Sequence, residues 1–145
     1  MDAGEVIERL GLVPHPEGGW YRETWRDLPA VGGRGVGSAI YFLLDAHERS
    51  HWHRVDAAEA WHHYAGGPLE LAIVEDVDHS VLTLGADLTA GVEPQAVVPA
   101  RAWQAARPVD GWVLAGCTVS PAFDFSAFEL APAGWSPKNW SHPGW

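Results

Sequence analysis

The first ten residues are the part of the chain in which apolar positions follow a helical period. Val6, Ile7 and Leu10 recur at intervals that place them on one face of a helix over residues 2–10. Gly11 follows where a glycine commonly ends a helix, because glycine adopts the left-handed conformation without strain. The pattern therefore predicts one short N-terminal helix.

After Gly11 the apolar residues form runs of strand length separated by Gly, Pro and Asp. These runs are Trp20–Trp25, Ser38–Leu44, Ala60–Tyr64, Leu69–Val74, Val81–Leu84, Ala96–Val98, Trp112–Val119 and Phe128–Leu130. Short strands at this spacing favour a sandwich or a closed barrel over strand–helix–strand units. No repeat or internal boundary is visible, so we predict one all-β domain over residues 1–145, with a glycine-rich loop at residues 29–35.

The C-terminal segment carries three tryptophans spaced five residues apart, Trp135, Trp140 and Trp145. Neither a helix nor a strand places side chains at that interval on one face. We interpret residues 132–145 as an extended arm whose indoles pack on the barrel or on a neighbouring subunit. The alternative is a mobile tail.

Composition and charge exclude several classes of partner. The chain has 19 Asp and Glu against 9 Lys and Arg, and a formal charge of -10 repels the phosphates of nucleic acid. No run approaches the ~20 apolar residues of a membrane span, and no basic amphipathic stretch suits a membrane surface. The N-terminus lacks a signal-peptide pattern. With Cys117 as the one cysteine an intrachain disulfide is impossible, so we expect a cytoplasmic protein in which Cys117 is a small buried residue.

The candidate chemistry lies in Ser50–Gly67. His51 and His53 share a face if they lie on a strand, because side chains alternate there. Residues 54–58 suit a turn, and Glu59 opens the next strand. If the turn is a hairpin, His51, His53 and Glu59 converge, and two imidazoles with a carboxylate suit a divalent transition metal. A chance His-x-His pair in a chain with eight histidines is the alternative.

This segment resembles the first cupin motif, which is His-x-His, a short gap, Glu, six residues and Gly, here Gly66. The counterpart of the second motif, Pro-x-Gly-x-x-His, is Pro99-Ala100-Arg101-Ala102-Trp103-Gln104. More broadly, the chain resembles the fifth cupin family, whose function is unknown. The matching runs are residues 12–25, 40–44, 51–66, 98–107 and 123–130. The resemblance implies a jelly-roll barrel, the double-stranded β-helix, over residues 12–131, usually dimeric, with relatives among sugar-nucleotide epimerases.

Three departures from the cupin pattern bear on metal binding. The gap between His53 and Glu59 is five residues, where metal-binding cupins usually have three or four. Arg101 replaces the motif's glycine, and Gln104 stands where the last metal-binding histidine belongs; an amide oxygen is a poorer ligand than imidazole. Therefore His51, His53, Glu59 and Gln104 either bind one divalent transition metal weakly or act without metal as acids, bases and hydrogen-bond donors.

Further side chains are candidates for substrate binding. They are Tyr21, Arg22, Trp61, Gln104, Arg107 and Asp124. Tyr21 and Arg22 follow a glycine turn, where they can meet an anionic or hydroxylated ligand or instead form an ion pair or a dimer contact. Asp124 lies between two phenylalanines, and is either a solvent-facing residue or a buried acid with a raised pKa. We expect the remaining histidines of the turns and the tail to lie at the surface; these are His15, His47, His79 and His142.

We expect an enzyme that acts on a sugar, a nucleotide sugar or another small hydroxylated metabolite. Without metal, His51, His63 or Glu59 would abstract a proton next to a carbonyl while Tyr64 or Tyr21 donates one. With metal, the ion would polarise the carbonyl, and isomerisation or epimerisation suits both versions. The alternative is a non-catalytic module that binds a metabolite in the same pocket. A purely structural role is less favourable, because burying such polar groups is costly.

Overall fold

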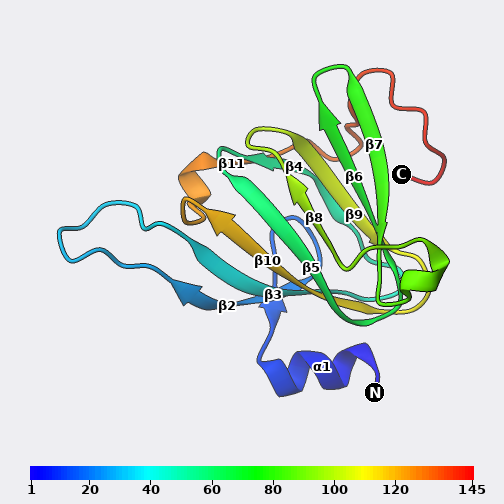
Figure 1. The fold of residues 1–145 in the computed structure, drawn as a ribbon, viewed down its shortest axis with the longest axis horizontal. Coiled ribbons are helices and arrows are strands. Elements are labelled where there is room, and N and C mark those ends of the chain that lie inside the picture. The colour runs from blue at the N-terminus through cyan, green and yellow to red at the C-terminus, as the bar shows by residue number, and fades with distance from the viewer.

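Two antiparallel sheets enclose the apolar core of the protein, whose computed structural model describes residues 1–145 (Figure 1). The first sheet contains, in spatial order, β1 (Val13–Pro14), β2 (Trp20–Arg26), β3 (Ser38–Leu44), β10 (Val113–Ser120), β5 (Ala58–Gly66) and β8 (Gln95–Val98). The second contains β11 (Phe128–Leu130), β4 (Ser50–Val55), β9 (Trp103–Pro108), β6 (Leu69–Glu75) and β7 (Asp78–Leu84). The chain repeatedly crosses from one sheet to the other, which confirms the predicted jelly roll.

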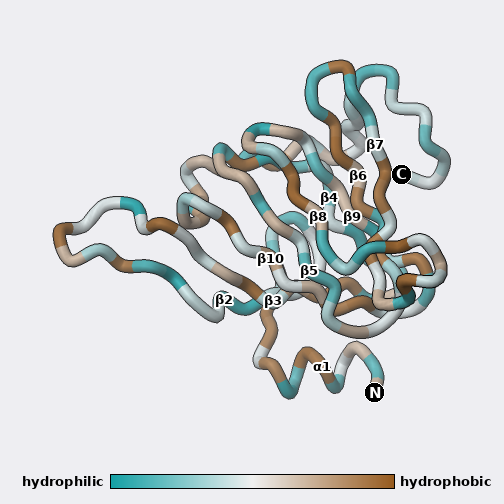
Figure 2. The backbone as a smooth tube through the Cα atoms, viewed as in Figure 1, coloured by the Kyte–Doolittle hydropathy of each residue, from teal (hydrophilic) through white to brown (hydrophobic).

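The predicted N-terminal helix is present as α1 (Ala3–Leu10). The Asp2 carboxylate accepts a hydrogen bond from the Glu5 backbone N–H and caps the first turn, and Gly11 ends the helix with φ 65°. Hydrophobic and hydrophilic residues alternate along α1 (Figure 2), and the apolar face, including Val6, packs on Leu43 of β3. No helix has the length and apolar character that a membrane crossing requires.

The main core lies between the two sheets, where alternate residues of facing strands point inward. Phe42 of β3 and Trp61 of β5 meet edge to face at 5.6 Å between ring centroids, and Leu69 and Leu71 of β6 are fully buried beside them. This packing fills most of the barrel. The cavity described below occupies the part of the interior that the core leaves open.

The tryptophan arm lies against the outer face of the second sheet. Trp140 meets Trp52 of β4 edge to face at 4.8 Å, and Trp135 lies 4.5 Å from Trp103 of β9. Trp145 joins the same cluster and stacks under the Arg107 guanidinium. Of the two packing partners predicted for the arm, the barrel of its own chain is therefore used. The homodimer stays a prediction.

Short 3₁₀ turns complete the barrel. One is η1 (Leu88–Ala90), between β7 and β8, and the other is η2 (Phe125–Ala127), between β10 and β11. The segment that holds η2 is fastened before β11, because the Phe123 N–H donates to Ser38 Oγ at 2.9 Å and Arg26 donates to the Phe123 carbonyl oxygen. This places three phenylalanines over one end of the barrel interior.

Candidate functional site

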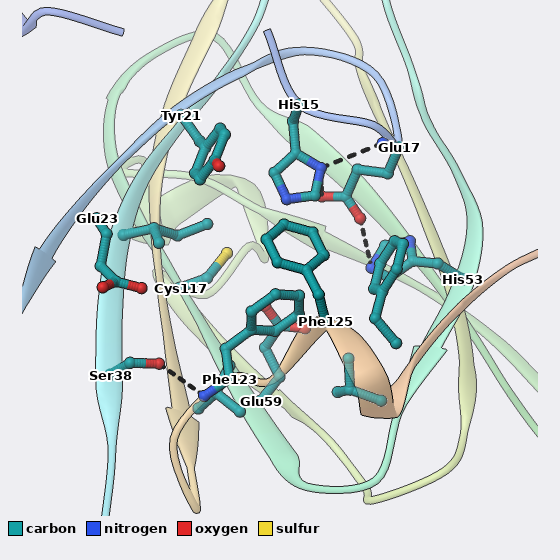
Figure 3. A pocket seen from close by; sticks show the side chains of 14 residues that line it. His15, Glu17, Tyr21, Glu23, Ser38, His53, Glu59, Cys117, Phe123 and Phe125 are labelled. Carbon is teal, nitrogen blue, oxygen red and sulfur yellow. Dashed lines mark hydrogen bonds and ion pairs between the residues drawn. The ribbon is translucent and has the colours of Figure 1, made fainter. Parts of the chain in front are cut away.

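A cavity of about 200 Å³ lies between the sheets beneath η2 (Figure 3). Strands of both sheets, the turn before β2 and the η2 segment contribute its lining. The lining residues are His15, Glu17, Tyr21, Glu23, Ser38, Ile40, His53, Val55, Glu59, Cys117, Val119, Phe123, Phe125 and Phe128. One wall is aromatic, and the opposite side gathers buried acids and histidines, so the cavity joins an apolar surface to ionisable groups as ligand sites do.

The shortest polar contact between side chains of the cavity lining joins Glu17 and His53. Glu17 Oε2 lies 2.7 Å from His53 Nε2, and both side chains are almost fully buried. His53 Nδ1 donates to the His51 carbonyl oxygen at 2.8 Å, because a carbonyl only accepts, and Nε2 donates to the ionised Glu17 carboxylate, so both ring nitrogens carry protons. Burial alone lowers the pKa of His53, but the attraction of Glu17 outweighs it and raises the pKa to about 9.

The Glu17 carboxyl responds in the opposite direction. Burial alone raises its pKa, yet the charge and hydrogen bond of His53 outweigh that cost and hold the pKa below its ordinary value. Carboxylate and imidazolium therefore stabilise each other as an ion pair inside the barrel.

The turn at residues 15–19 brings His15 and Glu17 into the cavity. Gly18 permits this, because its φ is +108° and a Cβ there would lie 2.0 Å from the Arg49 carbonyl oxygen, just before β4. A backbone hydrogen bond also joins the two segments, because the His51 N–H donates to the Glu17 carbonyl oxygen at 2.8 Å. The turn is thus fastened to the start of β4.

His15 is one of the residues that the sequence analysis misplaced. Instead of lying on the surface, its side chain is only 5% exposed and packs edge to face on Tyr21 at 4.6 Å. Nδ1 accepts the Glu17 backbone N–H at 3.1 Å, so the neutral ring carries its proton on Nε2. Burial lowers the pKa of His15 and favours that neutral form. The proline and glycines of the turn were the signal that this segment approaches other backbone closely.

Glu59, predicted as an acid–base or metal-binding residue, faces His53 across the cavity. Gln104 Nε2 donates to Glu59 Oε1 at 2.8 Å, while Gln104 Oε1 accepts from Trp61 Nε1 at 2.8 Å. Burial, assisted by the nearby Glu17 charge, raises the pKa of Glu59 to about 7. The charge of His53 and the hydrogen bond from Gln104 act in the opposite direction and offset only part of this rise. The Cys117 thiol lies against this carboxyl, and burial raises the pKa of that thiol well above its ordinary value.

The predicted hairpin between His53 and Glu59 is wrong, although the two side chains do line the same cavity. β4 pairs with β9 and β11 in the second sheet, whereas β5 pairs with β10 and β8 in the first. Residues 56 and 57 therefore connect the two sheets. His53 and Glu59 converge because each lies on the inner face of its own sheet.

The predicted inward position of His51 is also wrong, and a β-bulge is the reason. Ser50 pairs with Ala106 and His53 with Gln104, so three steps along β4 match two along β9. The extra residue breaks the alternation that gave His51 and His53 a common face. His51 Nε2 instead lies 3.0 Å from the Pro132 carbonyl oxygen, outside the cavity lining.

This arrangement does not fit the predicted metal centre. His51 faces away, the His53 nitrogens are occupied by Glu17 and the His51 carbonyl, and Glu59 is bonded to Gln104. No three His, Cys, Asp or Glu side chains are placed to hold one ion. Of the four predicted ligands, His53 pairs with Glu17 and Glu59 is hydrogen-bonded by Gln104 from outside the cavity lining, while the His51 side chain takes no part in these contacts.

Two of the predicted catalytic side chains on β5 lie away from the cavity. His63 Nε2 bonds the Gly67 carbonyl oxygen at 2.8 Å, and Tyr64 is 54% exposed. A register shift between β5 and β10 pairs His63 with Ala115 and Ala65 with Leu114, which leaves Tyr64 as an extra residue. Its ring covers Gly116 on the outside of the sheet.

Of the six predicted substrate-binding residues, Tyr21 lines the cavity and the other five do not, and one of these five is Gln104, which contacts Glu59 from outside the lining. Trp61 belongs to the apolar core, and Arg22 donates to the Leu10 carbonyl oxygen at the end of α1. Arg107 pairs with Glu70, and Asp124 caps η2 by accepting from the Ser126 N–H. Within its own chain Arg22 thus contacts the helix and forms no ion pair, and its alternative role as a dimer contact stays a prediction.

Comparison with known proteins agrees with this architecture. A family model described as Cupin superfamily (DUF985) matches residues 4–131. Protein SO0799 from Shewanella oneidensis is 40% identical with a TM-score of 0.85, over 90% of this chain and 85% of that one. A hypothetical protein from Leishmania major is 32% identical with a TM-score of 0.82, over 90% and 88%.

More distant similarity concerns the fold alone. Oxalate decarboxylase from Bacillus subtilis is 15% identical with a TM-score of 0.64, over 81% of this chain and 29% of that one. No protein with a curated description matches.

Proposed function

The chain belongs to the DUF985 family of the cupin superfamily, and from that premise we propose that its cavity is the active site of a proton-transferring enzyme. Its substrate is a small hydroxylated carbonyl compound, and its reaction is an isomerisation or epimerisation. The volume of about 200 Å³ is below the ~300 Å³ at which sites for drug-sized ligands begin. That size favours a simple sugar or a smaller molecule over a nucleotide sugar.

The environment of Glu59 is the observation that carries this proposal. A carboxyl whose pKa is raised to about 7 exists in both protonation states at neutral pH. The ionised form can take a proton from the carbon next to a carbonyl, and the protonated form can return it to the neighbouring carbon. The Gln104 amide fixes the carboxyl for both steps.

His15 supplies the complementary group. Its Nε2–H has no protein partner and belongs to a ring in the cavity wall (Figure 3), so it can donate to the substrate oxygen on which charge develops. The buried Glu17–His53 pair fixes the surrounding charges. The enediolate formed when Glu59 takes the proton would be held between these groups, with its oxygen accepting from the His15 Nε2–H.

Proton exchange with deuterated solvent tests the proposal. Purified protein is incubated in D₂O with small aldoses, ketoses and hydroxy ketones, and deuterium on carbon is followed by NMR. We expect incorporation with the wild type, loss with Glu59→Gln, and no change with Glu75→Gln, which removes the same charge at the exposed end of β6. Incorporation that survives Glu59→Gln contradicts the assignment of the base.

A second candidate is a metabolite-binding module without chemistry. It is favoured by His53, whose two nitrogens are both satisfied within the protein and are not free to transfer protons. Ligand binding measured by calorimetry, with no deuterium incorporated into the same ligand, would select this function.

A further inference from the structure

We propose that this cavity selects ligands by charge, accepting uncharged hydroxyl-bearing molecules and rejecting carboxylates and phosphates. The inference rests on the proposed function in treating the cavity as the ligand site. It goes beyond it by naming the chemical class that the site admits.

The cations at the cavity are already paired. His53 is held by Glu17 at 2.7 Å. The lining has three acids, Glu17, Glu23 and Glu59. Of these, Glu23 is held by Arg26 through two hydrogen bonds of 2.9 and 2.7 Å. No Lys or Arg belongs to the lining. Glu59 therefore remains as an acid without an ion-pair partner, and its ionised form presents a like charge to an incoming anion, with no free cation in the lining.

The available donors are neutral. The His15 side chain is 5% exposed and directs an unpartnered Nε2–H into the cavity, and the hydroxyl of Tyr21 lies beside it (Figure 3). A neutral N–H or O–H donor suits a hydroxyl or carbonyl oxygen, whereas strong recognition of carboxylate or phosphate uses charged, forked donors such as arginine. The uncharged hydrogen-bond donors therefore favour the same uncharged ligands as the lack of a free cation in the lining.

The aromatic wall strengthens this selection. Phe123, Phe125 and Phe128 contact one another over the cavity, with centroids 4.8 to 5.9 Å apart. Apolar surroundings lower the local dielectric response and so increase repulsion between like charges. The same phenyl faces can pack on the C–H faces of an uncharged polyol without any electrostatic repulsion.

Cys117 allows a direct test, because it lines the cavity beside Glu59 and is the one cysteine of the chain. Three methanethiosulfonate reagents with the same two-carbon chain are compared: 2-hydroxyethyl (neutral), 2-aminoethyl (cationic) and 2-sulfonatoethyl (anionic). In each case the thiolate attacks the reagent's sulfenyl sulfur, forms a mixed disulfide and releases methanesulfinate. Rates from mass spectrometry are divided by the rates with a free thiol, which removes differences in intrinsic reactivity.

We expect the neutral reagent to label native Cys117 about tenfold or more faster than the anionic one after this normalisation. Glu59→Gln should reduce that ratio severalfold, and Glu75→Gln, with the same change in net charge, should leave it unaltered. The ratio is insensitive to a general loosening of the variant, which accelerates all three reagents alike.

Equal normalised rates, faster labelling by the anion, or labelling only at the rate of unfolding would each overturn the inference. A strong preference for the cationic over the neutral reagent would also overturn it, since the site would then select amines. Charge selection without deuterium exchange on any substrate leaves this inference standing and removes the proposed chemistry. Deuterium exchange without charge selection leaves the proposed chemistry standing and removes this inference.

Discussion

The buried amide of Gln104 donates a 2.8 Å hydrogen bond to the carboxyl of Glu59, at the position where the second cupin motif has its histidine. Gln104 is completely buried and is held from its other side by the Trp61 indole. A residue that aligns with a metal ligand has here become a positioning residue for an acid.

Replacing Gln104 by methionine tests this role. The variant keeps the volume, removes the donor to Glu59 and leaves the Trp61 N–H unpaired, so we expect the free energy of unfolding to fall by ~1–3 kcal/mol. Without the hydrogen bond that favours its charged form, the pKa of Glu59 should rise further, and the pH midpoint of deuterium exchange should move upward. Gln95→Met, at an exposed position of β8, is the control and should change neither quantity.

The Glu59 carboxyl should make the protein less stable as pH rises. Its pKa is about 7 in the folded protein and 4.5 in the unfolded chain, so the folded state binds more protons between these values and loses stability across them. In Glu59→Gln this decline should disappear, which makes the variant more stable than the wild type by ~3 kcal/mol at pH 8. Urea unfolding from pH 4.5 to 8 measures the free energy of unfolding of both proteins. If that free energy changed with pH identically in the two, Glu59 would not be a buried carboxyl that titrates in this range.

From the sequence, strand alternation predicted that His53 and Glu59 point inward, and both line the cavity. The resemblance to the fifth cupin family is confirmed by the family match over residues 4–131. Alternation failed at His51, because the bulge in β4 depends on the pairing with β9. A bulge is set by the pairing of two distant segments, so no local pattern reveals it.

Two further features escaped sequence reasoning for the same physical reason. β9 has two alanines, a glutamine and an arginine, so its strand propensity is weak, and it forms because β4 and β6 pair with it on both sides. The inward turn of His15 depends on Gly18 lying against the Arg49 backbone. Tertiary contacts decided both outcomes.

The Glu17–His53 pair should dominate stability at neutral and mildly acidic pH. Glu17→Gln leaves the buried His53 without its countercharge, so we expect a loss of ~3 kcal/mol at pH 6. In the wild type, the pKa of His53 is raised from 6.5 to about 9, so this contribution is complete below pH 6.5 and lost as pH rises through 9. The variant should lack that decline in urea titrations.

The matched control for this pair is Glu129→Gln, which breaks the exposed ion pair with Arg54 at the edge of the second sheet. Exposed pairs contribute little, so its cost should be below ~1 kcal/mol at any pH. A similar cost for both variants would mean that the Glu17–His53 contact is not a buried ion pair in solution.

Gly18→Ala should separate the cavity turn from β4. The added Cβ would lie 2.0 Å from the Arg49 carbonyl oxygen, a backbone atom that cannot move away independently. Gly32→Ala is the control, because its φ is also positive but nothing lies near its Cβ position. We expect Gly18→Ala to lose more stability than the control and to abolish deuterium exchange, since His15 and Glu17 are displaced. Equal effects would assign the cost to backbone conformation alone.

The arm offers a test that separates the aromatic packing of Trp140 from the burial of its unsatisfied N–H. Trp140 packs on Trp52, and its Nε1–H is buried without a hydrogen-bond partner. Trp140→Ala removes the packing and should cost ~2 kcal/mol or more, whereas Trp140→Phe keeps an aromatic ring while removing the unsatisfied donor, whose burial costs ~1–3 kcal/mol. The phenylalanine variant should therefore unfold within about 1 kcal/mol of the wild type. If it is as damaged as the alanine variant, the indole N–H has a partner in solution, and the arm packs differently against the second sheet.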